Sequence, residues 1–225
     1  MSPAACPRHP GAALHHGLCT ACLVDAALRP PPDGPGEPTA RLTVQLPLGA
    51  TEAASVFLVR GEWPWRRLLR LKTGHRPAPP GFARRFALLQ QALERSRDDT
   101  IAMPLAAWID GRGRPCILTE FRQGLPLLER VRSGKLSREV AAHALRHLLE
   151  RTVSLHQREL VHGSIVSGNV FLGLDGAGFL LDFGLAPILA ARQGDAPSVD
   201  SDLAGFASLE RSLGEIAGGT LRPSL

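Results

Sequence analysis

Short stretches in which apolar and polar residues alternate dominate the first half of the globular part of the chain. Residues 42–48 alternate in this way and end at Gly49, while residues 54–59, 68–72 and 116–121 are further short apolar stretches. Alternation with a period of two is typical of strands that bury one face. We therefore expect several strands before residue 122.

Longer segments have the spacing of amphipathic helices. Residues 82–95 form one such segment, and Ser137 is a suitable N-cap for a long helix that continues to about His156. On one face of that helix we expect Val140, Ala144, Leu145, Leu148 and Leu149.

A hairpin is expected between these helices and the C-terminus. Residues 170–172 and 179–181 are apolar and flank the turn sequence Asp-Gly-Ala-Gly at 175–178. Strands first and helices later predict an α+β domain with two lobes.

Composition separates the first 40 residues from the rest. The sequence Arg-Pro-Pro-Pro-Asp-Gly-Pro-Gly-Glu-Pro at 29–38 cannot form a helix or a central strand, so we interpret it as a linker. The predicted organisation is a small module at 1–28, a linker at 29–40, and one domain at 41–225 with lobes at about 41–120 and 121–225.

The net charge of +5 and the many arginines between residues 60 and 97 give the chain a basic character. No motif with interleaved aromatic residues accompanies these charges and tyrosine is absent, so they indicate a solvated surface rather than a nucleic-acid partner. The first ten residues lack the apolar segment of a secretory leader, and no apolar run could span a bilayer. We expect a cytoplasmic protein without membrane contact.

The N-terminal module contains paired metal-ligand residues. Cys6 and His9 are separated by two residues, and Cys19 and Cys22 repeat that spacing. Two such pairs divided by a short loop are typical of a tetrahedral structural zinc site, whose binding energy would fold a segment this short.

The fourth zinc ligand is left open, because His15 or His16 could replace His9. The segment resembles the short zinc ribbons and B-box-like knuckles of multidomain proteins. That resemblance implies a protein partner and does not identify it.

A second set of residues resembles the protein kinase family. His162 and Asn169 have the spacing of the family's catalytic loop, and Asp182-Phe183-Gly184 follows the predicted hairpin as its Asp-Phe-Gly motif does. The resemblance implies that Asn169 and Asp182 supply oxygen ligands to magnesium bound with ATP.

Further matches occur in the family's order along the chain. Gly49 and Val56 lie where the Gly-rich loop is expected, Lys72 matches the ATP-contacting lysine, and Glu120 lies in a hinge-like segment after Thr119. Asp202 resembles the helix residue that supports the catalytic loop. The implied nucleotide-binding residues are Gly49, Val56, Lys72, Glu120, Asn169 and Asp182.

The sequence departs from the family at residues that carry the reaction. Ser164 replaces the catalytic aspartate, and a neutral hydroxyl is a poor base. Thr51 and Ala54 replace two loop glycines, and Leu89 stands where the lysine's glutamate partner is expected. Because only 43 residues follow Asp182 (225 − 182), we expect a kinase-like fold with a truncated C-terminal lobe.

These features give a leading hypothesis and two alternatives. The first is a pseudokinase that binds ATP and magnesium and acts as a regulatory or scaffolding module, with a zinc knuckle for protein contacts. The second is an active atypical kinase for Ser/Thr or small-molecule substrates. The third is a zinc-dependent interaction protein that binds no nucleotide. The oligomeric state is not predicted.

Overall fold

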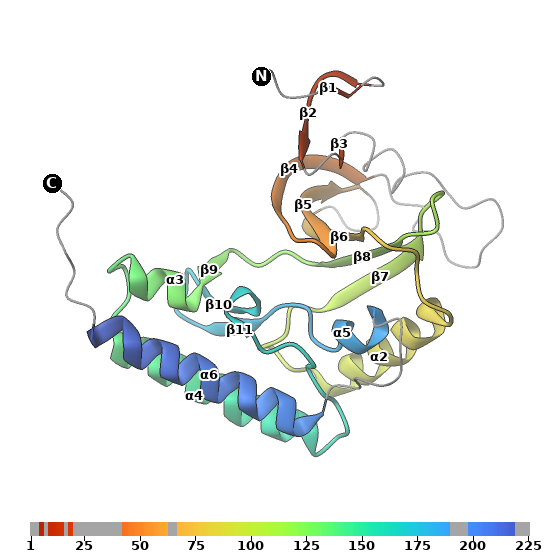
Figure 1. Ribbon diagram of the computed structural model, residues 1–225. Coiled ribbons are helices and arrows are strands. Elements are labelled where there is room, and N and C mark those ends of the chain that lie inside the picture. Colours follow the sequence, from red (N-terminus) through yellow and green to blue (C-terminus); the bar gives the residue numbers. More distant parts are fainter. Residues whose placement is uncertain are drawn as a thin grey trace, which may run out of the picture. The chain divides into compact units, whose positions relative to one another are not determined.

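The computed structural model describes the backbone of residues 5–6, 9–15, 18–19, 42–62, 67–189 and 198–218, and the side chains of 42–62, 67–189 and 198–216. The chain divides into two compact units. The first contains Met1–Arg84 and Pro104–Phe121, and the second contains Arg85–Met103 and Arg122–Leu225. Figure 1 shows the helices and strands of both units.

A five-stranded antiparallel sheet with the order β4-β5-β6-β8-β7 forms the first unit. Its strands are β4 (Leu42–Ala50), β5 (Ala54–Gly61), β6 (Leu68–Gly74), β7 (Pro104–Ile109) and β8 (Pro115–Glu120). Leu69 and Leu71 of β6 are buried, and the neighbouring positions 68, 70 and 72 are only partly so, as expected for a strand that buries one face. They pack with Phe57, Val59 and Leu118 in the unit's apolar core.

The N-terminal residues contribute a separate three-stranded antiparallel sheet with the order β1-β2-β3. The strands are β1 (Ala5–Cys6), β2 (His9–His15) and β3 (Leu18–Cys19). Cys6 is paired with His9 across β1 and β2, and Cys19 with Leu14 across β2 and β3. The backbone therefore sets the first predicted ligand pair opposite one another.

The second unit combines helices with a three-stranded antiparallel sheet of order β11-β10-β9. Its elements are most of α2 (Phe82–Ser96), then β9 (Gly124–Pro126), α3 (Leu127–Arg132), α4 (Arg138–His156), η1 (Ser167–Asn169), β10 (Val170–Gly173), β11 (Gly178–Leu180), α5 (Leu185–Leu189) and α6 (Val199–Gly218). The predicted hairpin is confirmed, with Val170 paired with Leu180 and Leu172 with Gly178.

Helix α4 begins as the sequence predicts, because the Ser137 hydroxyl accepts a hydrogen bond from the Val140 backbone N–H at 3.3 Å. Ala144, Leu145 and Leu148 are buried and Leu149 is half-buried. The prediction for Val140 was wrong, since its side chain is 49% exposed. At 100° per residue Val140 lies about a quarter turn from the centre of the buried stripe.

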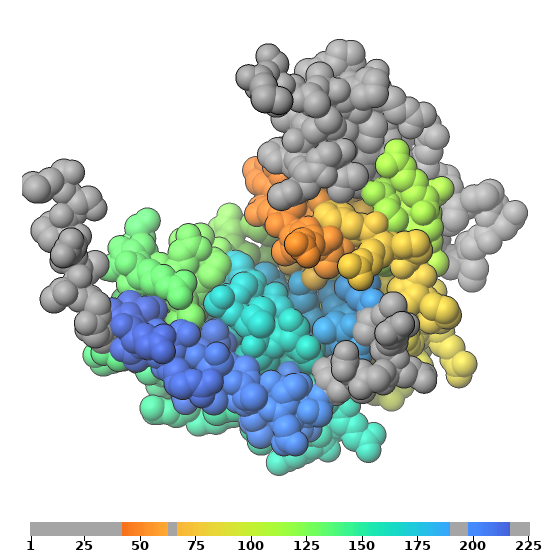
Figure 2. All heavy atoms as spheres, in the orientation of Figure 1, coloured from red at the N-terminus to blue at the C-terminus, as the bar shows by residue number. Residues whose placement is uncertain are grey.

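Helix α6 lies beside α4 along one side of the second unit (Figure 1), and the space-filling view shows it at the surface over its length (Figure 2). Phe206, Leu209 and Leu213 recur on its buried face. They join the larger apolar core of the chain, which includes residues of α3, α4 and β10.

The architecture confirms an α+β fold with antiparallel sheets. Within the described ranges, none of the helices is both long and apolar enough to cross a bilayer.

Candidate functional site

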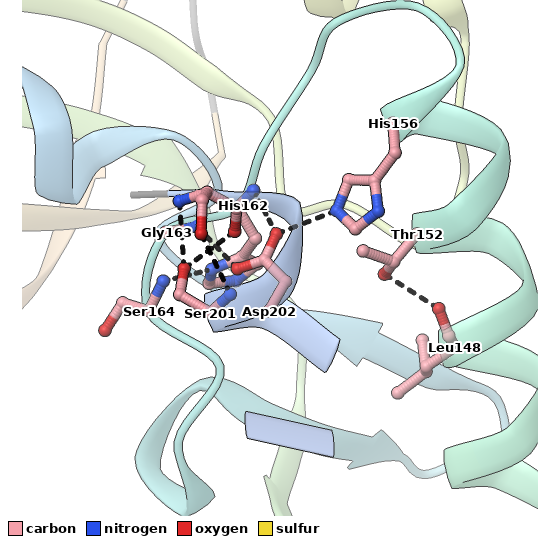
Figure 3. A network of polar contacts seen from close by, with 9 residues as sticks. Leu148, Thr152, His156, His162, Gly163, Ser164, Ser201 and Asp202 are labelled. Carbon is pink, nitrogen blue, oxygen red and sulfur yellow. Dashed lines mark hydrogen bonds and ion pairs between the residues drawn. The ribbon is translucent and has the colours of Figure 1, made fainter. Parts of the chain in front are cut away.

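The carboxylate of Asp202, completely buried in the first turns of α6, is the centre of a hydrogen-bond network (Figure 3). One oxygen, Oδ1, accepts from the Gly163 backbone N–H at 2.8 Å. The other, Oδ2, accepts from the His162 N–H at 2.8 Å and from His156 Nε2 at 2.9 Å. A buried carboxylate that accepts three hydrogen bonds holds the backbone of residues 162 and 163 in place.

The position of Asp202 is set by local contacts at the start of α6. The Ser198 hydroxyl accepts from the Ser201 N–H at 3.1 Å, and the Ser201 hydroxyl accepts from the Ser198 N–H at 3.0 Å. This reciprocal exchange resembles a capping box and satisfies donors that a helix start leaves unpaired. These contacts hold the first turn of α6 independently of the hydrogen bonds between Asp202 and the backbone of residues 162 and 163.

The imidazole of His162 is also fully buried and is held at both nitrogens. Its Nε2 donates to the Leu181 carbonyl at 3.0 Å, and its Nδ1 accepts from the Ser164 N–H at 3.1 Å. These contacts fix the neutral tautomer with hydrogen on Nε2. Burial lowers the pKa of His162 to about 4, despite the nearby charges of Asp202 and Asp182. The ring meets that of Phe183 edge to face.

Ser164 and Asn169, both in the predicted catalytic loop, contact each other. The Asn169 amide Nδ2 donates to the Ser164 carbonyl at 2.9 Å and lies 3.4 Å from its hydroxyl. The Asn169 carbonyl accepts from the Leu181 N–H at 2.9 Å, which sets Asn169 beside the residue that precedes Asp182. The structure thus brings Ser164, Asn169 and the start of the Asp-Phe-Gly segment together.

Asp182 and Gly184 both have left-handed backbone conformations, with φ of 60° and 67°. Gly184 donates its N–H to the His162 carbonyl at 3.0 Å. A β-carbon at Gly184 would lie 2.6 Å from Leu89 Cδ1, so this side chain of α2 packs directly on the glycine. One turn earlier, Arg85 Nη2 donates to the Ile188 carbonyl of α5 at 3.0 Å. Helix α2 therefore contacts the 184–188 segment through two side chains.

In the first unit, three of the predicted nucleotide-binding residues lie in one row across the sheet. Gly49 of β4 is paired with Val56 of β5, and Val56 is paired with Lys72 of β6. Directly opposed residues of antiparallel strands share a face, so Val56 and Lys72 point to the same side. Glu120 lies at the end of β8, paired with Leu69 and 3.5 Å from Arg67 in an ion pair.

The predicted zinc ligands lie in the part of the chain whose side chains are not described, and Cys22 lies outside the described residues altogether. Among the side chains at 42–62, 67–189 and 198–216, no group of three His, Cys, Asp or Glu comes together as a metal site. Cys116 is a buried core residue of β8.

Two residues of the site in the second unit were not predicted from the sequence. The sequence places His156 only near the end of a predicted helix, yet in the structure its Nε2 contacts Asp202, 46 positions further along the chain. In the sequence, nothing marks Arg85 as a site residue, since it is one of several arginines in a predicted amphipathic helix. The only sequence signal for His156 is its place in the last turn of α4, shortly before His162.

No protein-family model matches the chain. The search of curated proteins found no match either.

Proposed function

We propose that the chain is a nucleotide-binding module of protein-kinase-like fold that does not transfer phosphate, and that it acts as a regulatory or scaffolding protein. The observation that carries this proposal is the Asp202 network. The carboxylate accepts from the backbone of His162 and Gly163, the role that the kinase resemblance implies for an aspartate at this point of the chain.

The sheet of the first unit supports a nucleotide site. Lys72 lies on β6, which is the third strand of the five-stranded sheet and is followed along the chain by α2. In protein kinases the lysine that contacts ATP phosphates is also on the third strand, before the helix that carries its glutamate partner. The row of Gly49, Val56 and Lys72 therefore agrees with the implied order of contacts.

The second unit supports binding without transfer. The catalytic base position is a serine, and its carbonyl and hydroxyl lie against the Asn169 amide. A serine hydroxyl is neutral at pH 7 and accepts a proton poorly. At the position expected for the lysine's carboxylate partner, Leu89 packs on Gly184 and against the apolar core. Compared with the kinase family, serine at position 164 and leucine at position 89 each remove a negative charge that phosphoryl transfer uses.

The N-terminal sheet supports a zinc knuckle as a second part of the proposal. The backbone of Cys6 is paired with that of His9 across β1 and β2, which agrees with one ion bound by both residues. A closed four-ligand site has no open position for catalysis, so this module would present a surface to a protein partner.

Thermal unfolding with and without ATP and magnesium tests the nucleotide proposal. We expect an increase of several degrees in melting temperature, because a ligand at a hundred times its Kd stabilises the native state by about 2.7 kcal/mol. Asp182→Asn should abolish the magnesium-dependent part. Asparagine is the better substitution here, since it tolerates the left-handed φ of 60° and alanine does not.

A radiolabelled ATP assay on the same samples separates the competing functions. Binding without transfer supports the pseudokinase. Transfer by the wild type that disappears in Asp182→Asn would favour an active atypical kinase. The absence of any shift at millimolar ATP and magnesium would contradict nucleotide binding and leave the zinc-dependent interaction protein.

A further inference from the structure

Helix α4 carries two histidines, His143 and His147, on its solvent-facing side. Both side chains are exposed, whereas Ala144, Leu145 and Leu148 from the same turns are buried in the core. Residues four apart on an α-helix are neighbours, with Cβ atoms about 5–6 Å apart. The two imidazoles therefore project from adjacent turns of one face, close enough to bind the same ion.

The chemistry of the pair suits a transition metal. Imidazole binds metal through an unprotonated ring nitrogen, and it is a good ligand for Zn²⁺, Ni²⁺ and Cu²⁺ but not for Mg²⁺ or Ca²⁺. Two histidines at this same spacing on a helix hold one zinc ion in many metalloproteases. Among the described residues, neither ring of the α4 pair is used in a hydrogen bond or an ion pair.

The fold holds the two histidines in place before any ion binds. The Ser137 hydroxyl caps the first turn of α4, and the apolar side of the helix packs in the larger core. In an unfolded chain the same two residues would be joined by flexible backbone, so an ion would have to order that backbone in order to bind both. In the folded helix the second imidazole acts at a high effective concentration.

The charges along this face also favour a cation. Between residues 139 and 150 of α4 the exposed charged side chains are Glu139, Arg146 and Glu150. Glu139 lies one turn before His143, and Glu150 lies three residues after His147. Two carboxylates against one guanidinium leave a net negative charge beside the pair, which attracts a divalent cation.

We propose that His143 and His147 form a metal site on the surface of α4 that binds one divalent transition-metal ion. Among the described side chains, no third His, Cys, Asp or Glu joins them, so water completes the coordination. Such a site exchanges its ion more readily than a closed site with four protein ligands, and dialysis removes the metal. It goes beyond the proposed function and does not depend on nucleotide or on the N-terminal module.

Calorimetric titration of the full chain with Ni²⁺ tests the site. We expect His143→Gln and His147→Gln each to weaken Ni²⁺ binding at least about tenfold, since either change leaves a single imidazole. The double substitution should cost far less than the product of the two single effects, because a chelate is lost with its first member. The N-terminal cysteines are the same in all variants, so Ni²⁺ bound there contributes equally to each titration.

A rearranged variant keeps the number of histidines and destroys their spacing. His147→Gln combined with Ser154→His places the second imidazole eleven positions from His143 (154 − 143), about 16 Å along the helix axis. Position 154 is exposed, so the core is not disturbed. This variant should bind Ni²⁺ as weakly as His147→Gln alone.

Urea unfolding provides an independent measurement. Ni²⁺ should raise the unfolding midpoint of the wild type and leave that of the double variant unchanged by comparison, because the folded helix binds the ion more tightly than the unfolded chain. Without metal the two proteins should unfold at similar urea concentrations, since both substituted positions are exposed.

Two results would overturn the proposal. Equal Ni²⁺ affinity of the wild type and the double variant would show that the pair does not bind metal. Wild-type affinity in the rearranged variant would show that the number of histidines matters and their spacing does not. Failure of the ATP titration would leave this proposal untouched, because no residue of the pair belongs to the proposed nucleotide site.

Discussion

At the scale of single residues, His162 shows how burial decides the behaviour of a side chain. Its ring is fully buried, donates to the Leu181 carbonyl and accepts from the Ser164 N–H. A second proton would have to enter at Nδ1, where that N–H already points. Burial and this contact together favour the neutral ring, in agreement with a pKa lowered to about 4.

We predict that His162 makes the protein less stable in acid. The unfolded chain takes up the proton near the ordinary pKa of 6.5, whereas the folded chain does so near 4, so the free energy of unfolding decreases as the pH falls between these values. The loss from this group is on the order of 3 kcal/mol, since each pKa unit corresponds to about 1.4 kcal/mol. Urea unfolding at a series of pH values measures it.

His162→Gln is the control, because glutamine keeps a polar side chain and does not titrate. The variant should have a shallower dependence of stability on pH between 4 and 6.5, whatever its stability at neutral pH. An equal slope in both proteins would show that other groups cause the acid sensitivity.

Residue-level prediction from sequence succeeded where the information is local. The Ser137 cap depends on residues three positions apart and was confirmed. The contact between His156 and Asp202 joins residues 46 positions apart on different helices, and no local pattern contains it. Asp202 itself was predicted only because a family resemblance supplied the long-range relation.

At the scale of elements, the approach of α6 to the loop before η1 depends on a glycine. A β-carbon at Gly205 would lie 2.5 Å from the Ile165 carbonyl oxygen and 2.6 Å from Ile165 Cβ. Backbone atoms cannot move aside as the end of a flexible side chain can. Helix α6 and the loop that contains Ile165 would therefore have to move apart. Asp202 lies one turn earlier on the same helix, and its hydrogen bonds to His162 and Gly163 would lengthen.

We therefore predict that Gly205→Ala destabilises the protein by about 1–3 kcal/mol, the usual cost of overpacking. If the chain binds nucleotide as proposed, the substitution should also lower its affinity for ATP, because the loop that carries Asn169 loses its support. Chemical unfolding and a calorimetric titration with ATP and magnesium measure the two effects.

Gly214 provides a matched control on the same helix. It is exposed, and a β-carbon there meets no atom within 4 Å. Gly214→Ala should stabilise the protein by about 0.5–1 kcal/mol, the helix preference of alanine over glycine. Similar effects of the two substitutions would contradict the close approach at Gly205.

The elements that the sequence did not predict have weak local signals. Strand β7 begins with Pro104 and contains two alanines, a composition that strands disfavour, and it is stable because it pairs with β8 at the sheet edge. Strand β9 has three residues, two of them glycine and proline, and exists through its pairing with β10. Tertiary context, absent from any short window, produces both.

At the scale of the whole molecule, zinc and nucleotide are proposed to bind to different parts of the chain. We predict one zinc ion per chain, bound by Cys6, Cys19, Cys22 and one histidine, because the two ligand pairs have the spacing of a structural site. Elemental analysis of purified protein measures it. His9→Ala, compared with a double substitution at His15 and His16, identifies the histidine.

Cys116→Ala is the control for zinc content. Burial raises the pKa of the Cys116 thiol to about 12, so it stays protonated at neutral pH and does not ligate metal. Its removal should leave the zinc content unchanged, whereas Cys22→Ser should reduce it to near zero. Protein without zinc that cannot be reloaded by added metal would refute the site.

The distribution of aromatic residues has a consequence for spectroscopy. The chain has three tryptophans, at positions 63, 65 and 108, and no tyrosine. All three positions belong to the first unit, and Trp108 is buried in its core. Intrinsic fluorescence therefore reports the first unit alone, while far-ultraviolet circular dichroism is dominated by α4, α6 and the other helices of the second. Comparing the two unfolding curves reveals, without any label, whether the units unfold together.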